Sequence, residues 1–411
     1  MQGGPANRGA FVTLQPVRAT IAGVKAVADP AAERLTAREA YQHGQAARAV
    51  ALQTELLAAR AAAGDDTADD YLFLGLALTS QGQLAEAIAG LRDGLARFPD
   101  HPALHENLGV LLLTTGAYAD AIAASEQALA LGSASPNVLD CLTDAHARLG
   151  RTDLAVTYGR QTLVAKDRKF GATPPLVTLP AVAPPPFSPA NPAENVIAYG
   201  LWGNAQRYQV PLLENARIRA HLFPAWSMRV YHDDTVDPAY LALLRERGVD
   251  LHPMRLPPDL PVHRKLLWRF TVASEPGVRR FLCRDADSLL TVKERVAVDA
   301  WLASALPFHA MRDWYTHTDL LLAGMWGGVG GLLPPLERLL EAYRGWRVEY
   351  DHVDQDLLSE TVWPIVRGHV LIHDSVFAPC LGSVPFPPFG ALPPSMHIGQ
   401  NAFMHFERAG Q

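Results

Sequence analysis

Two acidic side chains stand directly after an apolar run in the second half of the chain. Asp285 and Asp287 follow Phe281, Leu282 and Cys283, which is the pattern of a buried strand that has just ended. Residues two apart in an extended chain point to the same side, so both carboxylates face one way. Paired carboxylates suit a hard divalent cation such as Mn²⁺ or Mg²⁺, which also holds a diphosphate. Ionised groups at the end of a buried strand need a partner of this kind.

The same D-x-D spacing recurs at 354–356, so its meaning depends on the elements around it. Residues 196–411 alternate apolar runs with helical patterns, which predicts an α/β domain with a mostly parallel sheet. Ligands of such sheets lie beyond the carboxyl ends of the strands. The predicted strands are 195–203, 227–234, 249–254, 278–290, 307–313 and 369–375. The predicted helices are 209–223, 238–248, 264–276, 292–304 and 336–346.

Together these elements and motifs resemble a nucleotide-diphospho-sugar glycosyltransferase of the GT-A type. The resemblance rests on "YGLWGN", "YHDD", a helix that carries Lys and Arg, "RDADS", "GMWGG" and a helix that opens with "DQD". It implies that Asp285 and Asp287 bind the metal and the donor diphosphate. It also implies that Tyr199 and either Asp233 or Asp234 face the nucleoside, with Asp233 favoured. The alternative for those two acids is an N-cap of the next helix.

Three cations lie close to these motifs in the sequence. Lys265 and Arg269 are four apart, which places them on one face of the predicted helix. They are expected to meet either the phosphate or the sugar of a donor, or else a surface salt-bridge partner. Arg284 adjoins the aspartates and either pairs with them or contacts the sugar.

The stretch "GMWGGVGG" is the second unusual feature of this region. It contains Gly324, Trp326, Gly327 and Gly328. Glycines permit a close approach of the backbone to a ligand, and the tryptophan offers a flat apolar face to a sugar ring. A core tryptophan beside a tight turn is the alternative.

The resemblance also implies a third metal ligand and a catalytic base. A late histidine is the expected ligand, and the candidates are His397, in "MHIGQ", and His373, in "VLIHDS". Transfer with inversion requires a carboxylate that takes the proton of the acceptor hydroxyl. Asp313, Asp354 and Asp356 are the candidates for that base. The stereochemical outcome and the third ligand stay open at this stage.

The first half of the chain contains an internal repeat of 34 residues. The repeated positions are Leu74, Leu108 and Leu142; Gly82, Gly116 and Gly150; and Ala87, Ala121 and Ala155. Small residues at these offsets are the tetratricopeptide signature, in which paired helices pack closely and a glycine relaxes the turn between them. Residues 35–62 are expected to form one further, degenerate helical pair.

The predicted organisation has four parts. Residues 1–30 form a flexible leader, and residues 31–168 form the tetratricopeptide domain. Residues 169–195 are rich in proline and form a semi-rigid linker or a strap along the surface. Residues 196–411 form the GT-A domain.

Composition excludes several classes of protein. The net charge of −6 argues against a nucleic-acid partner. The three cysteines are widely spaced and fit neither a disulfide framework nor a thiolate zinc site, which favours a reducing cytoplasm. The sequence shows no signal peptide and no apolar run that could span a membrane. Scarce lysine and abundant arginine and alanine indicate a bacterial coding bias.

The sequence therefore predicts a cytoplasmic, metal-dependent glycosyltransferase. The donor is a nucleotide-diphospho-sugar, with a UDP-sugar favoured, and the repeats recruit a protein or peptide acceptor. The alternative is an interaction scaffold whose transferase-like domain is inactive. A nucleotidyltransferase is a third hypothesis, although "YGLWGNAQRY" is a poor version of the loop that holds a triphosphate.

Overall fold

The computed structural model describes residues 36–181, 184–258, 260–343, 352–390 and 396–402. The chain divides into two compact units, Met1–Tyr158 and Gly159–Gln411. The predicted leader, 1–30, lies outside the described residues. None of the described helices is both long and apolar enough to cross a membrane.

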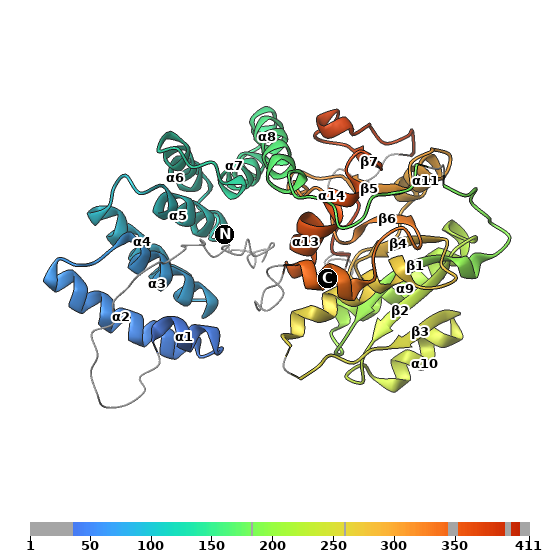
Figure 1. Cartoon of the computed structure of the whole chain (residues 1–411), viewed down its shortest axis with the longest axis horizontal. Helices are drawn as coiled ribbons and strands as arrows, with labels where there is room; N and C mark the ends of the chain where they lie inside the picture. Colours follow the sequence, from blue (N-terminus) through green and yellow to red (C-terminus); the bar gives the residue numbers. More distant parts are fainter. Residues whose placement is uncertain (1–35, 182–183, 259, 344–351, 391–395, 403–411) are drawn as a thin grey trace, which may run out of the picture. The chain divides into compact units, whose positions relative to one another are not determined.

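The first unit consists of helical pairs. Its helices are α1 (Ala37–Gln42), α2 (Ala46–Ala63), α3 (Ala68–Ser80), α4 (Leu84–Arg97), α5 (Pro102–Thr114), α6 (Tyr118–Ala130), α7 (Pro136–Arg148) and the first part of α8 (Thr152–Gly171). In Figure 1, α3, α5 and α7 lie along one side of this unit and α4 and α6 along the other. The predicted helical repeats are confirmed, including the degenerate pair, which is α1 and α2.

The repeated residues explain this packing. Ala87, Ala121 and Ala155 have no exposed surface, so the second helix of each pair lies close to its neighbours. Each repeated glycine adopts a left-handed conformation in the turn between paired helices, with φ of +73° at Gly82 and +85° at Gly116. Residues with a Cβ adopt this conformation at a cost, whereas glycine adopts it freely.

The second unit is built on a sheet of seven described strands in the order β3-β2-β1-β4-β6-β5-β7 (Figure 1). The strands are β1 (Asn195–Leu201), β2 (Ser227–His232), β3 (Val249–Pro253), β4 (Arg280–Arg284), β5 (Phe308–Arg312), β6 (Met325–Val329) and β7 (Val370–Asp374). Every pairing is parallel except the two made by β6, which runs antiparallel to β4 and β5. The predicted mostly parallel sheet is confirmed.

Helices accompany this sheet along the chain. They are the second part of α8, η1 (Pro192–Glu194), α9 (Gln206–Leu222), α10 (Pro238–Glu246), η2 (Val262–Ser274), α11 (Val292–Leu302), α12 (Leu336–Ala342), α13 (Val353–Leu357), η3 (Leu358–Val362), α14 (Trp363–Val366) and η4 (Cys380–Gly382). Here η1, η2 and η4 are 3-10 helices, and η3 is a π-helical turn.

Alternation along β1 produces two hydrophobic layers. Val196 and Ala198 pack with η2, α12 and α13, whereas Ile197 and Tyr199 pack with α9, α10 and α11. All seven residues of β1 are buried. A strand covered on both faces is apolar along its whole length, which is why the sequence showed a continuous apolar run there.

The predicted proline-rich segment, 169–195, is a strap on the second unit where the structure describes it. α8 continues through its first residues, to Gly171. Further along, Val177 packs against the core layer beside η2. Phe187 stacks on Trp226, with ring centroids 5.7 Å apart. The segment is therefore attached to the α/β unit by apolar contacts.

Two elements differ from their predictions. The stretch at 324–331 is not only a glycine-rich turn, because 325–329 form β6. Gly327 and Gly328 fit this central strand because a Cβ at either would collide with β4 or β5 side chains or backbone. The predicted helix at 264–276 is a 3-10 helix, which turns by about 120° per residue instead of about 100°.

Candidate functional site

Aspartates gather at the carboxyl edge of the sheet. Asp233 follows β2, Asp285 follows β4, Asp313 follows β5 and Asp374 ends β7. These strands run in the same direction, so the four residues lie along one edge. That edge is where ligands of α/β sheets bind.

Asp285 and Asp287 are brought together in the loop after β4. Their side chains are 39% and 20% exposed, so both reach solvent. Burial and the negative charge of Asp285 raise the pKa of Asp287 to about 6. A Cβ at Gly324 would lie 1.9 Å from Asp285 Oδ2, so the Asp285 carboxylate rests directly on that glycine. A side chain at 324 would therefore require the Asp285 carboxylate to move.

A buried arginine joins Asp285 to one of the base candidates. Arg269 Nη2 lies 3.0 Å from Asp285 Oδ1 and 2.8 Å from Asp354 Oδ2. The Arg269 side chain is 4% exposed, and its Nε has no hydrogen-bond partner. Burial raises the pKa of Asp354, and the charge of Arg269 offsets only part of that effect. The result is a compact network of two carboxylates around one guanidinium.

A second ion pair lies at the end of β2. Lys265 Nζ donates to Asp233 Oδ2, and the Thr235 hydroxyl donates to Asp233 Oδ1 at 2.5 Å. Burial alone would raise the pKa of Asp233, but these hydrogen bonds outweigh it and lower the pKa. Neither acid of "YHDD" caps α10, because the N-cap is Asp237, whose side chain accepts from Ala239 N.

The predicted shared face of Lys265 and Arg269 is corrected by the 3-10 geometry of η2. Four residues at about 120° each separate the two side chains by about 120° around the axis. Lys265 therefore pairs with Asp233, whereas Arg269 pairs with Asp285 and Asp354. Lys265 with Asp233 and Arg269 with Asp354 are largely buried ion pairs instead of surface salt bridges, whereas Asp285 stays partly exposed.

Tyr199 and Trp326 do not lie where the sequence placed them. Tyr199 has no exposed surface and packs in the layer with α9 and α11, so its side chain does not face a nucleoside. Trp326 is 1% exposed and meets Phe270 and Phe281 edge to face. Strand alternation turned both rings into the core, which corrects the predicted contacts with the nucleoside and the sugar.

Arg284 and Gly327 also lie in the interior of the second unit. Arg284 is 2% exposed and pairs with Glu294 of α11, with Nε–Oε1 at 2.5 Å. It pairs with neither of the neighbouring aspartates and does not reach the surface. A Cβ at Gly327 would lie 2.3 Å from Phe281 O, so this glycine allows β6 to approach β4.

His373 is not placed to be the third metal ligand. It lies inside β7, which β6 and β5 separate from β4, at about 4.8 Å per strand. It is 2% exposed, and its Nδ1 lies 2.9 Å from His309 Nε2. Burial lowers the pKa of His373 to about 4, which keeps this buried histidine neutral.

His397 belongs to a segment whose later residues contact the loop of the aspartate pair. Its ring stacks on Trp314, with centroids 4.8 Å apart, and meets His317 edge to face. Five residues later, Ala402 N donates to Asp287 O at 2.8 Å. Within the part of the chain that the structure describes, no three His, Cys, Asp or Glu side chains form a cluster that could hold a metal.

The three base candidates have different surroundings. Asp354 belongs to the Arg269 network described above. Asp313 accepts hydrogen bonds from Lys293, Ser375 and Ile398 N, and is almost fully buried. Asp356 lies apart from both, and burial together with the charges of Asp319 and Glu360 raises its pKa to about 7.

Sequence reasoning missed two contributors to this edge. Arg207, in the first turn of α9, brings Nη2 to 3.8 Å from Asp287 Oδ2. Its only sequence signal is its position just after "YGLWGN". Lys293 pairs with Asp313, twenty residues along the chain. No spacing rule connects those two residues, because the sheet brings α11 and β5 together.

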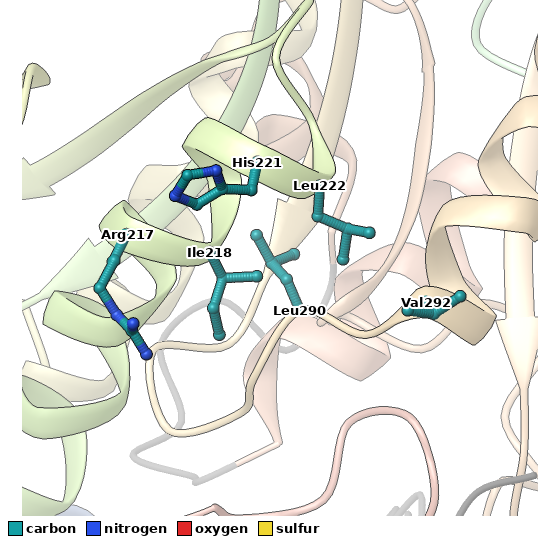
Figure 2. Close-up of a pocket in the computed structure, with 6 residues that line it drawn as sticks. All are labelled: Arg217, Ile218, His221, Leu222, Leu290 and Val292. Atoms are coloured by element: carbon teal, nitrogen blue, oxygen red, sulfur yellow. The ribbon is translucent and has the colours of Figure 1, made fainter.

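An apolar hollow of about 380 Å³ lies elsewhere on the second unit. Figure 2 shows Ile218 and Leu222 of α9 facing Leu290 and Val292, with Arg217 and His221 at the rim. None of the predicted site residues lines it.

Comparisons with known proteins concern mainly the first unit. Residues 74–136 match the family model described as tetratricopeptide repeat. A search of curated proteins finds no match to the chain.

Three solved structures illustrate the similarity. A crystal structure of MamA is 20% identical, with a TM-score of 0.29, over 32% of this chain and 75% of that chain. A tetratricopeptide protein of Thermus thermophilus is 24% identical, with a TM-score of 0.27, over 31% and 70%. A mutant O-GlcNAc transferase of Thermobaculum terrenum is 20% identical, with a TM-score of 0.33, over 54% of this chain and 41% of that chain.

TM-scores this low carry no conclusion about the fold or activity of the second unit. The helical pairs and the family match agree for the first unit. Residues 74–136 of this chain are tetratricopeptide repeats.

Proposed function

We propose that the second unit is a metal-dependent glycosyltransferase of the GT-A type. It uses a nucleotide-diphospho-sugar, with a UDP-sugar favoured, and the repeats of the first unit recruit a protein or peptide acceptor. The observation that carries the proposal is the pair Asp285 and Asp287 at the carboxyl edge, in which Asp285 packs on Gly324 and is joined to Asp354 through Arg269.

The donor set at this edge fits a divalent cation. Carboxylate oxygens are the hard ligands that Mn²⁺ and Mg²⁺ prefer. Asp285 and Asp287 both reach solvent, and repulsion by the negative charge of Asp285 helps to raise the pKa of Asp287. A cation between them relieves that repulsion. When bound, it supplies positive charge against the leaving diphosphate.

The chain's own residues supply the remaining parts of this proposed mechanism. Arg207 and Lys265 place positive charge beside Asp287 and Asp233, where donor phosphates and polar groups would lie. Asp354 is the base candidate beside Asp285, because Arg269 Nη2 contacts both carboxylates, and its Oδ1 accepts from Gln355 N. Its raised pKa suits a group that takes a proton from an acceptor hydroxyl.

Release of nucleoside diphosphate tests this activity in the full chain. UDP-sugars and GDP-sugars are offered with Mn²⁺, and turnover is followed by a coupled assay. Asp285→Asn and Asp287→Asn should each lower turnover by about 100-fold or more, since charge stabilisation of this kind is worth that much. The matched control is Asp299→Asn, an exposed aspartate of α11 that pairs with Arg295.

The inactive scaffold is the rival function. The ion pairs of Arg269 favour it, because they balance two of the acids from within the chain. This rival predicts that no donor is turned over. It also predicts that Asp287→Asn and the unchanged chain release equally little nucleoside diphosphate. Release of pyrophosphate from a nucleoside triphosphate would instead support a nucleotidyltransferase.

Acceptor recruitment has its own test. Transfer of labelled sugar to a bacterial protein extract is compared between the unchanged chain and Leu76→Arg. Leu76 is a half-buried residue of α3. We expect transfer to protein to fall while release of nucleoside diphosphate to water is unchanged. Arg92→Ala, on the exposed surface of α4, is the control. Equal transfer by Leu76→Arg and the unchanged chain counts against recruitment by α3.

A further inference from the structure

The Asp313 carboxylate is fully engaged by neighbouring groups. Oδ1 accepts from Lys293 Nζ and from the Ser375 hydroxyl, the latter at 2.6 Å. Oδ2 accepts from Ile398 N at 2.8 Å. Asp313 is 5% exposed. Both oxygens therefore accept hydrogen bonds in a buried setting, and one donor is the cationic ammonium of Lys293, so this side chain is built to anchor its neighbours.

The partner of Oδ2 lies in the short segment 396–402, which continues to the loop that carries Asp285 and Asp287. Ala402 N donates to Asp287 O at 2.8 Å. Ser288 and Asn401 form an antiparallel bridge. The segment is thus fixed at Asp313 by Ile398 and at the Asp285–Asp287 loop by its last residues. It connects the ends of β5 and β4 across the edge of the sheet.

The middle of the segment is packed too tightly to shift on its own. Ile398 is 1% exposed and belongs to a small apolar cluster with Met311 and Met325. Gly399 has φ of +80°, and a Cβ there would lie 2.9 Å from Met325 Sδ. Ile398 and Gly399 thus pack against the same side chain, Met325, so loss of the Ile398 hydrogen bond is expected to loosen the residues that follow.

We propose that Asp313 is a positioning residue, whose carboxylate holds segment 396–402 against the backbone of Asp287. The cation affinity of Asp285 and Asp287 then depends on Asp313, although Asp313 is not itself a ligand. This inference rests on the proposed function for its cation, and on the contacts above for its geometry. It also replaces the predicted role of Asp313 as a catalytic base.

Amide exchange and Mn²⁺ binding test the proposal in the full chain. In Asp313→Ala, the amides of Ile398 and Ala402 should exchange at least tenfold faster than in the unchanged chain. The Mn²⁺ dissociation constant, measured by electron paramagnetic resonance without donor, should rise about tenfold. Exchange at Ala402 is the decisive arm, because it reports an effect that has travelled four residues from the lost hydrogen bond.

The matched control is Asp167→Ala, which removes another buried carboxylate of the second unit. Asp167 accepts from Trp363 Nε1 and Arg367, which lie outside segment 396–402. This control should leave the Mn²⁺ dissociation constant unchanged, and it should speed exchange at Ile398 and Ala402 no more than at other buried amides of the second unit. If Asp313→Ala fails to fold, Asp313→Asn replaces it, because it keeps the volume and loses the ion pair with Lys293.

Two results would overturn the inference: unchanged exchange at Ala402, or faster exchange with an unchanged Mn²⁺ affinity. If the unchanged chain binds no Mn²⁺, the proposed function fails. Exchange at Ala402 alone then decides whether Asp313 positions the segment.

Discussion

The two units fill their interiors in different ways. In the first unit the same small side chains recur at the helix contacts, and Ala87, Ala121 and Ala155 have no exposed surface. In the second unit the carboxyl edge of the sheet encloses charged groups, among them Arg269, which is 3% exposed. Close apolar packing stabilises a repeat array directly, whereas buried ion pairs seldom stabilise a fold more than apolar residues would.

This difference indicates where chemistry is concentrated. A repeat domain needs only to present a surface to a partner, and alanine, leucine and glycine are sufficient to fill its interior. The network of Asp285, Arg269 and Asp354 has a cost that packing does not explain. Clusters of ionisable groups with shifted pKa values are typical of functional sites. We therefore expect charge changes to affect the second unit and volume changes to affect the first.

The largest expected effect is the loss of the guanidinium in Arg269→Met. Asp285 and Asp354 would lose their shared counter-charge, and breaking a buried pair of this kind costs about 3–5 kcal/mol. All eight tryptophans lie after residue 201, so tryptophan fluorescence during denaturant unfolding reports the second unit alone. Arg217→Met is the control, since the Arg217 side chain is 70% exposed. If Arg269→Met lowers the unfolding free energy by less than about 1 kcal/mol, Arg269 does not stabilise the charges of Asp285 and Asp354.

A volume change in the first unit is the matching experiment. A Cβ at Gly109 would lie 2.6 Å from Ser125 Oγ and 3.3 Å from Ala121 O. Gly109→Val should therefore destabilise the first unit by about 2 kcal/mol through overpacking. Gly90→Ala is the control, because the nearest atom to its Cβ is 3.9 Å away.

Labelling of the buried Cys141 thiol, followed by mass spectrometry, measures opening of the first unit. Equal labelling rates for Gly109→Val and Gly90→Ala would contradict the close packing of these helices.

A third change sharpens the boundary between the units. The sequence places Asp167 in the repeat domain, but its carboxylate accepts from Trp363 Nε1 at 2.9 Å and from two nitrogens of Arg367. Asp167→Ala should destabilise the second unit by about 1–3 kcal/mol, because it leaves Trp363 without its acceptor. Tryptophan fluorescence is again the measurement, and Arg168→Ala, at an exposed position, is the control. If Asp167→Ala changes only the labelling rate of Cys141, this part of α8 belongs with the repeats of the first unit.

The smallest expected effect is a pH dependence at Asp356. Burial, with the charges of Asp319 and Glu360, raises its pKa to about 7 from an ordinary value of 3.8. The unfolded chain releases this proton near pH 4 and the folded chain only near pH 7, so the contribution to stability falls as pH rises between them. Asp356→Asn should gain about 1 kcal/mol over the unchanged chain at pH 7.5 and nothing at pH 4. A difference in unfolding free energy that does not vary with pH would disprove the shifted pKa.

Local patterns predicted most of the fold. The predicted period of 34 residues recurs in the structure, where α3, α5 and α7 begin at 68, 102 and 136. Apolar runs located six of the seven described strands. β6 escaped because glycine is rare in strands, and only the approach of Phe281 and Phe308 explains its presence at 327 and 328.

Long-range contacts within the site were beyond the sequence. The position of Asp285 after a strand was predictable, but its link to Asp354 passes through Arg269, 85 residues before Asp354. The burial of Tyr199 and Trp326 depends on which sheet face each residue occupies, and both faces are covered here. A sequence pattern indicates alternation, but it does not reveal that neither face is open.

Calorimetric titration of the full chain tests the central claim most directly. Mn²⁺ is titrated first and a panel of UDP-sugars and GDP-sugars second, with the unchanged chain, Asp287→Asn and the control Asp299→Asn. We predict Mn²⁺-dependent binding of at least one donor, retained by Asp299→Asn and weakened about 100-fold or more in Asp287→Asn. Absence of Mn²⁺-dependent binding for every donor, or equal binding by Asp287→Asn, would contradict the account.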